Sequence, residues 1–335
     1  MMQRLVARYY SLLILLSLFM LFVLLVLHVA VGSVAISPAT VIAALFNQPV
    51  EPFQHIIIWD LRLPRALIAL LAGAMFGLAG AILQVVIRNS LAEPEMTGAT
   101  SGAVLCAVLW LALAPAQTAQ PGPVLPFVAL IGGLVGGALV YLLSGQGYHD
   151  PVRLVLTGVL ISAVLRSAIA IILLLRQEVM GTVLLWLIGS LNGLVWTQLD
   201  ILWPWALIAL SLGLTCASLA NVLQLGEENA SSLGLNVTMT RLGLFGVAAL
   251  LTASAVAIVG GLTFLGLLAP HLARRVVGAD ARRLFPFSML VGSAVLLAAD
   301  TVTQAISQPI SIPVGAALAL LGAPFFLYLV WRRRP

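Results

Sequence analysis

Apolar runs of about twenty residues follow one another along almost the whole chain. A run of that length crosses the hydrocarbon core of a bilayer as one helix, because a helix rises about 1.5 Å per residue. Only 8% of the 335 residues are charged and the mean hydropathy is +1.14, whereas soluble domains carry about 25% charged residues. The sequence therefore predicts an all-α polytopic membrane protein, with residues 1–335 forming a single transmembrane domain.

Ten windows have the length and hydropathy expected of a transmembrane helix. They cover residues 11–32, 66–87, 97–115, 124–144, 154–175, 201–220, 242–260, 262–270 with its flanks, 286–305 and 313–331. The first window resembles a signal peptide, but its length and the spans that follow favour a retained helix. Pro270 and His271 shorten the eighth. A further apolar stretch, Val183 to Trp196, is too short to span and favours a re-entrant or surface helix.

The arginines predict how these helices are oriented, because cytoplasmic loops carry an excess of Lys and Arg. All sixteen basic residues are arginines. With the N-terminus in the cytoplasm, twelve of them lie in inner segments: Arg4, Arg8, Arg88, Arg153, Arg241, Arg274, Arg275, Arg282, Arg283, Arg332, Arg333 and Arg334. Arg62, Arg65 and Arg176 then lie outside, and Arg166 lies within a span. We therefore expect both termini, and the polar segment 221–241, in the cytoplasm.

Glycines four residues apart mark positions where helices approach closely in a membrane. Such pairs are Gly73/Gly77, Gly132/Gly136 and Gly133/Gly137. Packing within the chain is the simpler interpretation of these pairs. An interface with a second subunit is the alternative.

Segment 221–241 is the one long polar stretch between apolar runs. Gly226 and Gly234 bracket the sequence EENASSL, and Glu227 and Glu228 stand where the first turn of a helix favours acids. Glycine is a common residue just past a helix end. We expect one short helix along the membrane surface, and a capped loop without a docking role would give a similar pattern.

The sequence lacks the residue sets expected of an enzyme. Histidines, cysteines and paired acids are scattered: His28, His55, His149, His271, Cys106, Cys216, Glu93/Glu95 and Glu227/Glu228. No metal-ligand spacing is present, and without lysine the chain cannot form a standard P-loop. An ion-coupled secondary transporter needs ionisable groups within its spans, and Arg166 and Asp300 are too few to favour that class. We expect neither catalytic residues nor a metal, a cofactor or a nucleic-acid partner for this chain.

Two arginines on the predicted outer side depart from the charge bias. Pro64 is expected just ahead of the second helix, with Arg62 before it and Arg65 near the first turn. Charge alone leaves two interpretations open. The arginines either anchor the chain in lipid headgroups or receive an acidic partner.

Several loop motifs together resemble one family of transport proteins. They are LRLPR (61–65), GLAGAILQ (77–84), RNSLAEPEMTGATSGA (88–103), WLIGSLNG (186–193), LGEENASSLGLN (225–236), GLLAPHLAR (266–274) and IPVGAALALLGAPFFLYL (312–329). In this order they resemble FecCD/BtuC-type permeases, the membrane subunits of type II ABC importers for iron-siderophores, haem and cobalamin. The resemblance covers roughly residues 55–334.

The resemblance implies partners as well as a fold. It implies ten transmembrane helices per subunit in the bacterial cytoplasmic membrane, and two such subunits, identical or different, around one pathway. It implies a cytoplasmic ATPase dimer that binds ATP and Mg²⁺, and an extracytoplasmic substrate-binding protein. The coupling helix between helices 6 and 7 would contact the ATPase through Leu225, Gly226, Glu227, Glu228, Ser231, Leu233 and Gly234. Arg62 and Arg65 would dock the binding protein, and Asn89 and Leu91 would close the inner end of the pathway.

Two positions depart from the family pattern. Gln304 stands where the vitamin B12 permease has a further docking arginine, which favours a heterodimer with a related permease. Ser90 replaces the usual proline after Asn89, and we expect little effect from this change.

Arg166 is the sequence feature that bears most directly on cargo. An arginine at the middle of a helix is costly unless it faces protein or water. It either attracts an anionic ferric siderophore or pairs with a nearby acid or carbonyl group. Iron-siderophore import by ATP-driven alternating access is therefore the predicted function, and cobalamin or haem import is the alternative.

Overall fold

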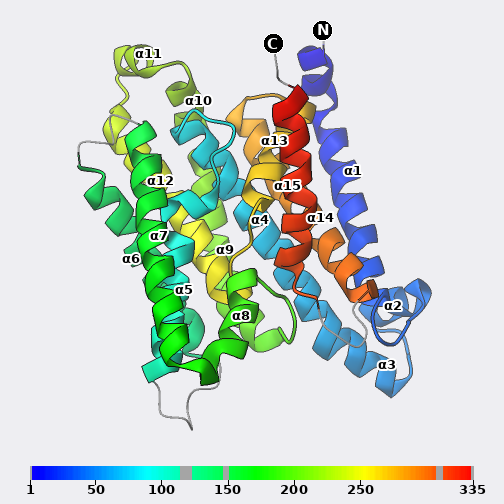
Figure 1. Cartoon of the computed structure of the whole chain (residues 1–335). Coiled ribbons are helices and arrows are strands. Elements are labelled where there is room, and N and C mark those ends of the chain that lie inside the picture. Colours follow the sequence, from blue (N-terminus) through cyan, green and yellow to red (C-terminus); the bar gives the residue numbers. More distant parts are fainter. Residues whose placement is uncertain (1, 114–122, 146–150, 307–311, 333–335) are drawn as a thin grey trace.

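Every regular element that the computed structural model describes is helical, and the helices form one bundle (Figure 1). The structure describes residues 2–113, 123–145, 151–306 and 312–332. Its elements are α1 (Met2–Ala30), α2 (Pro38–Leu45), α3 (Pro52–Ile56), η1 (Ile57–Arg62), α4 (Leu63–Val86), η2 (Pro94–Thr97), α5 (Ala99–Leu113), α6 (Leu125–Leu143), α7 (Pro151–Leu175), η4 (Gln177–Val179), α8 (Met180–Ile188), α9 (Trp196–Thr215), α10 (Ala217–Gln224), α11 (Glu227–Ser232), α12 (Val237–Val259), α13 (Leu265–Val277), α14 (Ala281–Ile306) and α15 (Val314–Arg332). The all-α prediction is confirmed for these residues.

Among the described residues, seven helices are long and apolar enough to cross a membrane. They are Tyr9–Ala30, Pro52–Val86, Leu125–Leu143, Val152–Leu175, Trp196–Thr215, Val237–Val259 and Ala281–Ile306. The third and tenth windows fall on two shorter apolar helices, Ala99–Leu113 and Val314–Leu327, and the eighth falls on α13. The count of ten transmembrane helices stays a prediction.

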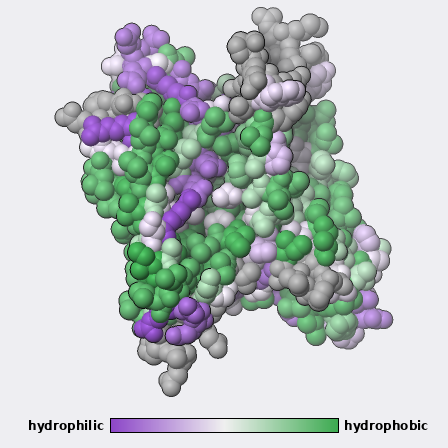
Figure 2. Space-filling view, in the orientation of Figure 1, coloured by the Kyte–Doolittle hydropathy of each residue, from purple (hydrophilic) through white to green (hydrophobic). Residues whose placement is uncertain are grey.

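The two ends of the bundle carry different elements. Both termini and α11 lie at one end, termed the α11 end, whereas α2, α3 and α8 lie at the other, termed the α3 end (Figure 1). Hydrophilic side chains gather at both ends, and a hydrophilic stripe crosses the mostly apolar face between them (Figure 2). The termini thus share an end with segment 221–241, as the arginine pattern predicts. Of the inner arginines, Arg333 and Arg334 lie outside the described residues.

Glycines bring the central helices α4, α12 and α14 against their neighbours. A methyl group on Gly73 or Gly77 of α4 would overlap the backbone of α14 at Gly292 and Ser288. The other predicted pairs behave alike, because Gly132 and Gly136 face the backbone around Gly98 and Gly102, and Gly133 and Gly137 face α12. These pairs therefore pack within the chain, and the simpler interpretation is confirmed for them.

The start of the second span differs from the prediction. The helix does not begin at Pro64 but runs without a break from Pro52 to Val86. A proline lacks the N–H that an α-helix needs, and its ring crowds the preceding turn. The helix accommodates Pro64 through the π-helical turn of η1. In this turn the Leu63 N–H donates to the Ile58 carbonyl, five residues earlier. The motif LRLPR therefore lies inside a helix.

Candidate coupling, docking and pathway sites

Segment 225–236 folds into a short helix held between two glycines. Gly226 has a φ of +107° and Gly234 has a φ of +80°, which side-chain-bearing residues rarely adopt. Glu227 and Glu228 occupy the first turn of α11, where the helix dipole favours acids. The Gly234 N–H donates to the Ser231 carbonyl at 2.8 Å and ends the helix. The predicted short helix is confirmed, and it is separate from α10.

The outward surface of α11 combines exposed leucines with polar groups. Leu225, Glu228, Ser231 and Leu233 are all exposed. A shallow hollow of about 500 Å³ lies beside them, lined by Glu227, Ser231, Gly234, Leu235, Asn236, Val237 and Thr238. Exposed apolar side chains beside a hydrophilic hollow are suited to contact with another protein.

Two polar links fix α11 and the preceding helix α10 to the bundle. The Arg241 guanidinium, which is buried, donates to the Glu227 carboxylate at 2.6 Å. The Asn221 side chain donates to the Asp280 carboxylate at 2.7 Å and accepts from the Ala281 N–H at 2.7 Å. Movement of α11 would therefore be transmitted directly to α12, and through α10 to the start of α14.

Arg62 and Arg65 both have partners inside the chain. The buried Arg62 guanidinium donates to the carbonyls of Val29, Ala30 and Val34 at 2.7, 3.1 and 2.6 Å. It thereby satisfies carbonyl groups at the end of α1, which have no partner inside that helix. The docking role of the two arginines stays a prediction, and Arg62 has a structural role beside it.

Arg65 takes part in a buried polar cluster. Its Nε and Nη2 donate to Asp300 Oδ2 and Oδ1 at 2.8 and 2.7 Å. His28 Nε2 lies 2.7 Å from Asp300 Oδ2, and Gln304 Nε2 lies 2.7 Å from His28 Nε2 and 3.0 Å from Asp300 Oδ2. The side chains of Asp300 and His28 are fully buried. This His28–Arg65–Asp300–Gln304 cluster joins α1, α4 and α14 near the α3 end.

A pocket opens beside this cluster and is termed the Arg65 pocket. It has a volume of about 520 Å³ and is lined by Gly32, Ser33, Val34, Phe53, Ile57, Leu61, Arg62, Arg65, Asn192, Gly193, Leu194, Val195 and Gln304. Gln304 thus shares a wall with Arg62 and Arg65. The docking role predicted for this side of the chain stays a prediction.

The loop after α4 contains the residues predicted to gate the pathway. Asn89 Oδ1 accepts from the Leu91 N–H at 2.9 Å, and Leu91 is exposed. The loop then enters the bundle as η2. Pro94 contacts Gly266 there, and the Met96 backbone lies against Gly158 of α7. Their gating role stays a prediction.

Arg166 forms an ion pair with Glu95 of η2. It lies at the middle of α7, and 54% of its side chain is exposed. The neighbouring Glu93 accepts a hydrogen bond from the Phe264 backbone. Burial, and after it the Glu95 carboxylate, raises the pKa of Glu93 from 4.5 to about 7. The interpretation of Arg166 as a partner of a nearby acid is confirmed, and contact with cargo stays a prediction.

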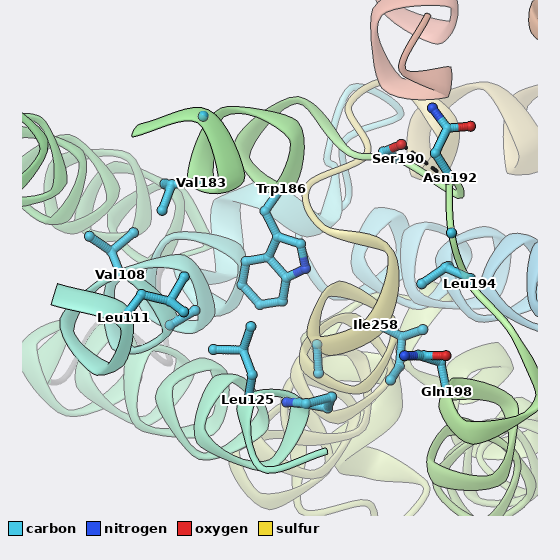
Figure 3. A pocket seen from close by; sticks show the side chains of 15 residues that line it. Val108, Leu111, Leu125, Val183, Trp186, Ser190, Asn192, Leu194, Gln198 and Ile258 are labelled. Atoms are coloured by element: carbon cyan, nitrogen blue, oxygen red, sulfur yellow. Dashed lines mark hydrogen bonds between the residues drawn. The ribbon is translucent and has the colours of Figure 1, made fainter. Parts of the chain in front are cut away.

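A second cavity lies under α8 and the loop that follows it. It has a volume of about 450 Å³ and is lined by Ala107, Val108, Leu111, Leu125, Pro126, Gly181, Val183, Trp186, Ser190, Asn192, Gly193, Leu194, Gln198, Ala257 and Ile258. The Trp186 ring points into it, and polar groups stand at one side (Figure 3). Asn192 to Leu194 form a wall that this cavity shares with the Arg65 pocket. The short helix predicted in Val183 to Trp196 corresponds to α8 and this wall.

Sequence reasoning missed the role of His28. In the sequence the four histidines are scattered and Asp300 has no evident partner. The available signal was that both residues interrupt apolar spans, where ionisable groups are expected to pair with one another.

The chain matches the FecCD transport family over residues 20–332. It belongs to that family. It is 38% identical over 310 residues, 92% of each chain, to the Fe(3+)-citrate import system permease protein YfmE of Bacillus subtilis. It is 37% identical to the hemin transport system permease protein HmuU of Yersinia pestis, covering 83% of this chain and 84% of that one. A solved metal-chelate type ABC transporter, in an inward-facing conformation, covers 96% of this chain and is itself covered completely, with a TM-score of 0.85 and 29% identity. The chain is thus a membrane permease of an ABC importer.

Proposed function

We propose that this FecCD permease imports a ferric chelate across the bacterial cytoplasmic membrane. The observation that carries the proposal is the identity of 38% to an Fe(3+)-citrate permease over 92% of the chain. Haem import is the main alternative, because a hemin permease is nearly as similar. Cobalamin import is a further alternative on the family resemblance.

The energy for transport would come from outside this chain. Without lysine it has no P-loop of its own, so a separate cytoplasmic ATPase dimer would bind ATP and Mg²⁺. The ATPase would grip α11 through Leu225, Glu228, Ser231 and Leu233, which are exposed. Through the Glu227–Arg241 and Asn221–Asp280 links the movement would reach α12 and α14 and rock the pathway open on alternate sides.

In this proposal the α11 end faces the cytoplasm, and the chain crosses the membrane ten times. The α3 end then faces outward and receives the substrate-binding protein at the Arg65 pocket. A second permease, identical or related, completes the pathway.

The Arg166–Glu95 pair refines the cargo hypothesis. The two charges offset each other, and attraction of an anionic chelate then depends on Arg166 leaving Glu95. An Arg166→Glu/Glu95→Arg double variant keeps the pair but reverses its direction. If Arg166 meets the cargo, this variant takes up little ferric chelate at normal expression. Uptake equal to that of the unmodified chain would leave the pair a structural role alone.

Reconstitution tests the function. Proteoliposomes with the permease, its ATPase and its binding protein should accumulate ⁵⁵Fe-citrate when ATP is enclosed on the ATPase side, and not with a proton or sodium gradient alone. Parallel assays with hemin and cobalamin distinguish the cargo alternatives. Uptake that needs an ion gradient but no ATPase would overturn the proposal in favour of a secondary transporter.

A further inference from the structure

In the part of the chain that the structure describes, the Arg65 guanidinium is held along one of its edges. Its Nε and Nη2 donate to the two oxygens of Asp300, and Nη1 takes part in neither bond. Arg65 lines the Arg65 pocket, and 16% of its side chain is exposed. A planar guanidinium has donors on more than one edge, so one arginine can bind two acceptors at once.

Asp300 is fixed in place for this bond. Its side chain is fully buried, and His28 on α1 and Gln304 on the same helix also lie within hydrogen-bonding distance of it. A buried carboxylate needs a cationic partner, because an unpaired buried charge is strongly unfavourable. The cluster therefore fixes the position of the guanidinium.

A residue at the wall between this pocket and the cavity under α8 carries a second donor that has no partner among the described residues. The Asn192 Nδ2 atom is buried and makes no hydrogen bond among the described residues, and Asn192 lines the same pocket. Two cationic side chains, Arg62 and Arg65, line it as well. A pocket with these donors is complementary to an acceptor with negative charge, and a carboxylate is the acceptor that proteins supply.

We propose that Arg65 bridges two carboxylates, with Asp300 as the positioning residue on the inner edge and an acidic side chain of the docked binding protein on the outer edge. The proposal rests on the proposed function, since it assigns the Arg65 pocket to the binding protein. It differs from docking by a free surface cation in one respect. A positive charge at position 65 is not enough for docking, because the planar guanidinium must bind both carboxylates at once.

Arg65→Lys is the variant that tests this difference, because it keeps the charge. A lysine ammonium is a compact point charge, and Asp300 would hold it away from the pocket. We expect Arg65→Lys to weaken docking at least about tenfold, nearly as much as Arg65→Gln. Docking is measured as the Kd between the nanodisc-embedded transporter and the binding protein that supports uptake. Arg176→Lys, a charge-preserving change at an exposed arginine, is the matched control and should leave the Kd unchanged.

The Asp300→Asn background supplies a second measurement. If Arg65 only packs against its neighbours, the effect of Arg65→Lys on docking is the same in this background. Without the carboxylate, lysine is free to meet the partner, and Arg65→Lys should then weaken docking by less than about threefold. Because arginine and lysine carry equal charge, long-range electrostatics cancels in this comparison. If Asp300→Asn fails to fold, the comparison of Arg65→Lys with Arg65→Gln still shows whether a positive charge alone is enough for docking.

Two results would overturn the inference. One is an Arg65→Lys variant that docks as tightly as the unmodified chain, and the other is an equal loss in both backgrounds. Failure of the proposed function would look different, because the unmodified transporter would then neither bind a substrate-binding protein nor accumulate cargo with ATP.

Discussion

Glu93 is a half-buried carboxyl whose pKa is raised to about 7, first by burial and then by Glu95. Between pH 4.5 and 7 the folded chain keeps this proton while the unfolded chain loses it, so its contribution to stability falls as the pH rises through that window. Glu93→Gln removes this pH dependence. Between pH 5 and pH 8 the free energy of unfolding of the variant should therefore rise by about 2 kcal/mol relative to that of the unmodified chain. Thermal unfolding in detergent at several pH values measures it, with exposed Glu228→Gln as control. If the melting temperatures of Glu93→Gln and of the unmodified chain change with pH in parallel, the prediction is wrong.

The two acids of α11 are expected to respond differently to charge reversal. Glu228 is exposed, whereas Glu227 bonds to the buried Arg241 at 2.6 Å. Glu228→Arg should therefore reduce co-purification of the ATPase while the melting temperature of the permease stays the same. Glu227→Arg should also lower that temperature, because it places a second cation beside Arg241. Equal melting temperatures in both variants would show that the ion pair adds nothing to stability.

At the scale of elements, glycine contacts set how closely α4 and α14 pack. A methyl group on Gly77 would overlap the Ser288 carbonyl, so Gly77→Ala must push the helices apart or strain them. We expect a loss of about 1–3 kcal/mol, seen as a lower melting temperature in detergent. Gly246→Ala on α12 is the control, since nothing lies within 4 Å of its added methyl group, and it should be neutral or slightly stabilising. A Gly77→Ala variant as stable as Gly246→Ala would contradict this packing.

Local signals decided which elements were predictable from the sequence. Gly226 and Gly234 predict both ends of α11, because glycine is the residue that most readily adopts the positive φ found at these two positions. Glycine spacing likewise predicted close helix contacts, although it could not say which helix faces which. The continuation of the helix through Pro64 is not predictable from the sequence. The π-helical turn that accommodates this proline depends on the packed structure, and no local sequence pattern indicates it. The His28–Asp300 contact joins residues 272 positions apart, and only their shared cost in lipid suggests it.

At the scale of the whole molecule, α7 presents a face that is incomplete in a single chain. Val159 stands two helical turns before Arg166 on the same side of α7 and is 49% exposed, and the Arg166 side chain is 54% exposed. An arginine at the middle of a span is unfavourable against lipid, by about 2.5–3.5 kcal/mol on insertion scales. This face therefore fits a subunit contact that borders an aqueous pathway better than it fits lipid.

Cysteine cross-linking tests this arrangement in the assembled transporter. With Cys106 and Cys216 replaced by alanine, Val159→Cys should form a disulfide or a short bismaleimide link to a second permease subunit. The mass of the product separates a homodimer from a heterodimer with a related permease. Leu207→Cys on α9, which is 60% exposed, is the control and should remain monomeric. Cross-linking at Leu207 without any at Val159 would place the interface on α9, and Arg166 would then depend on Glu95 alone for its stability in the membrane.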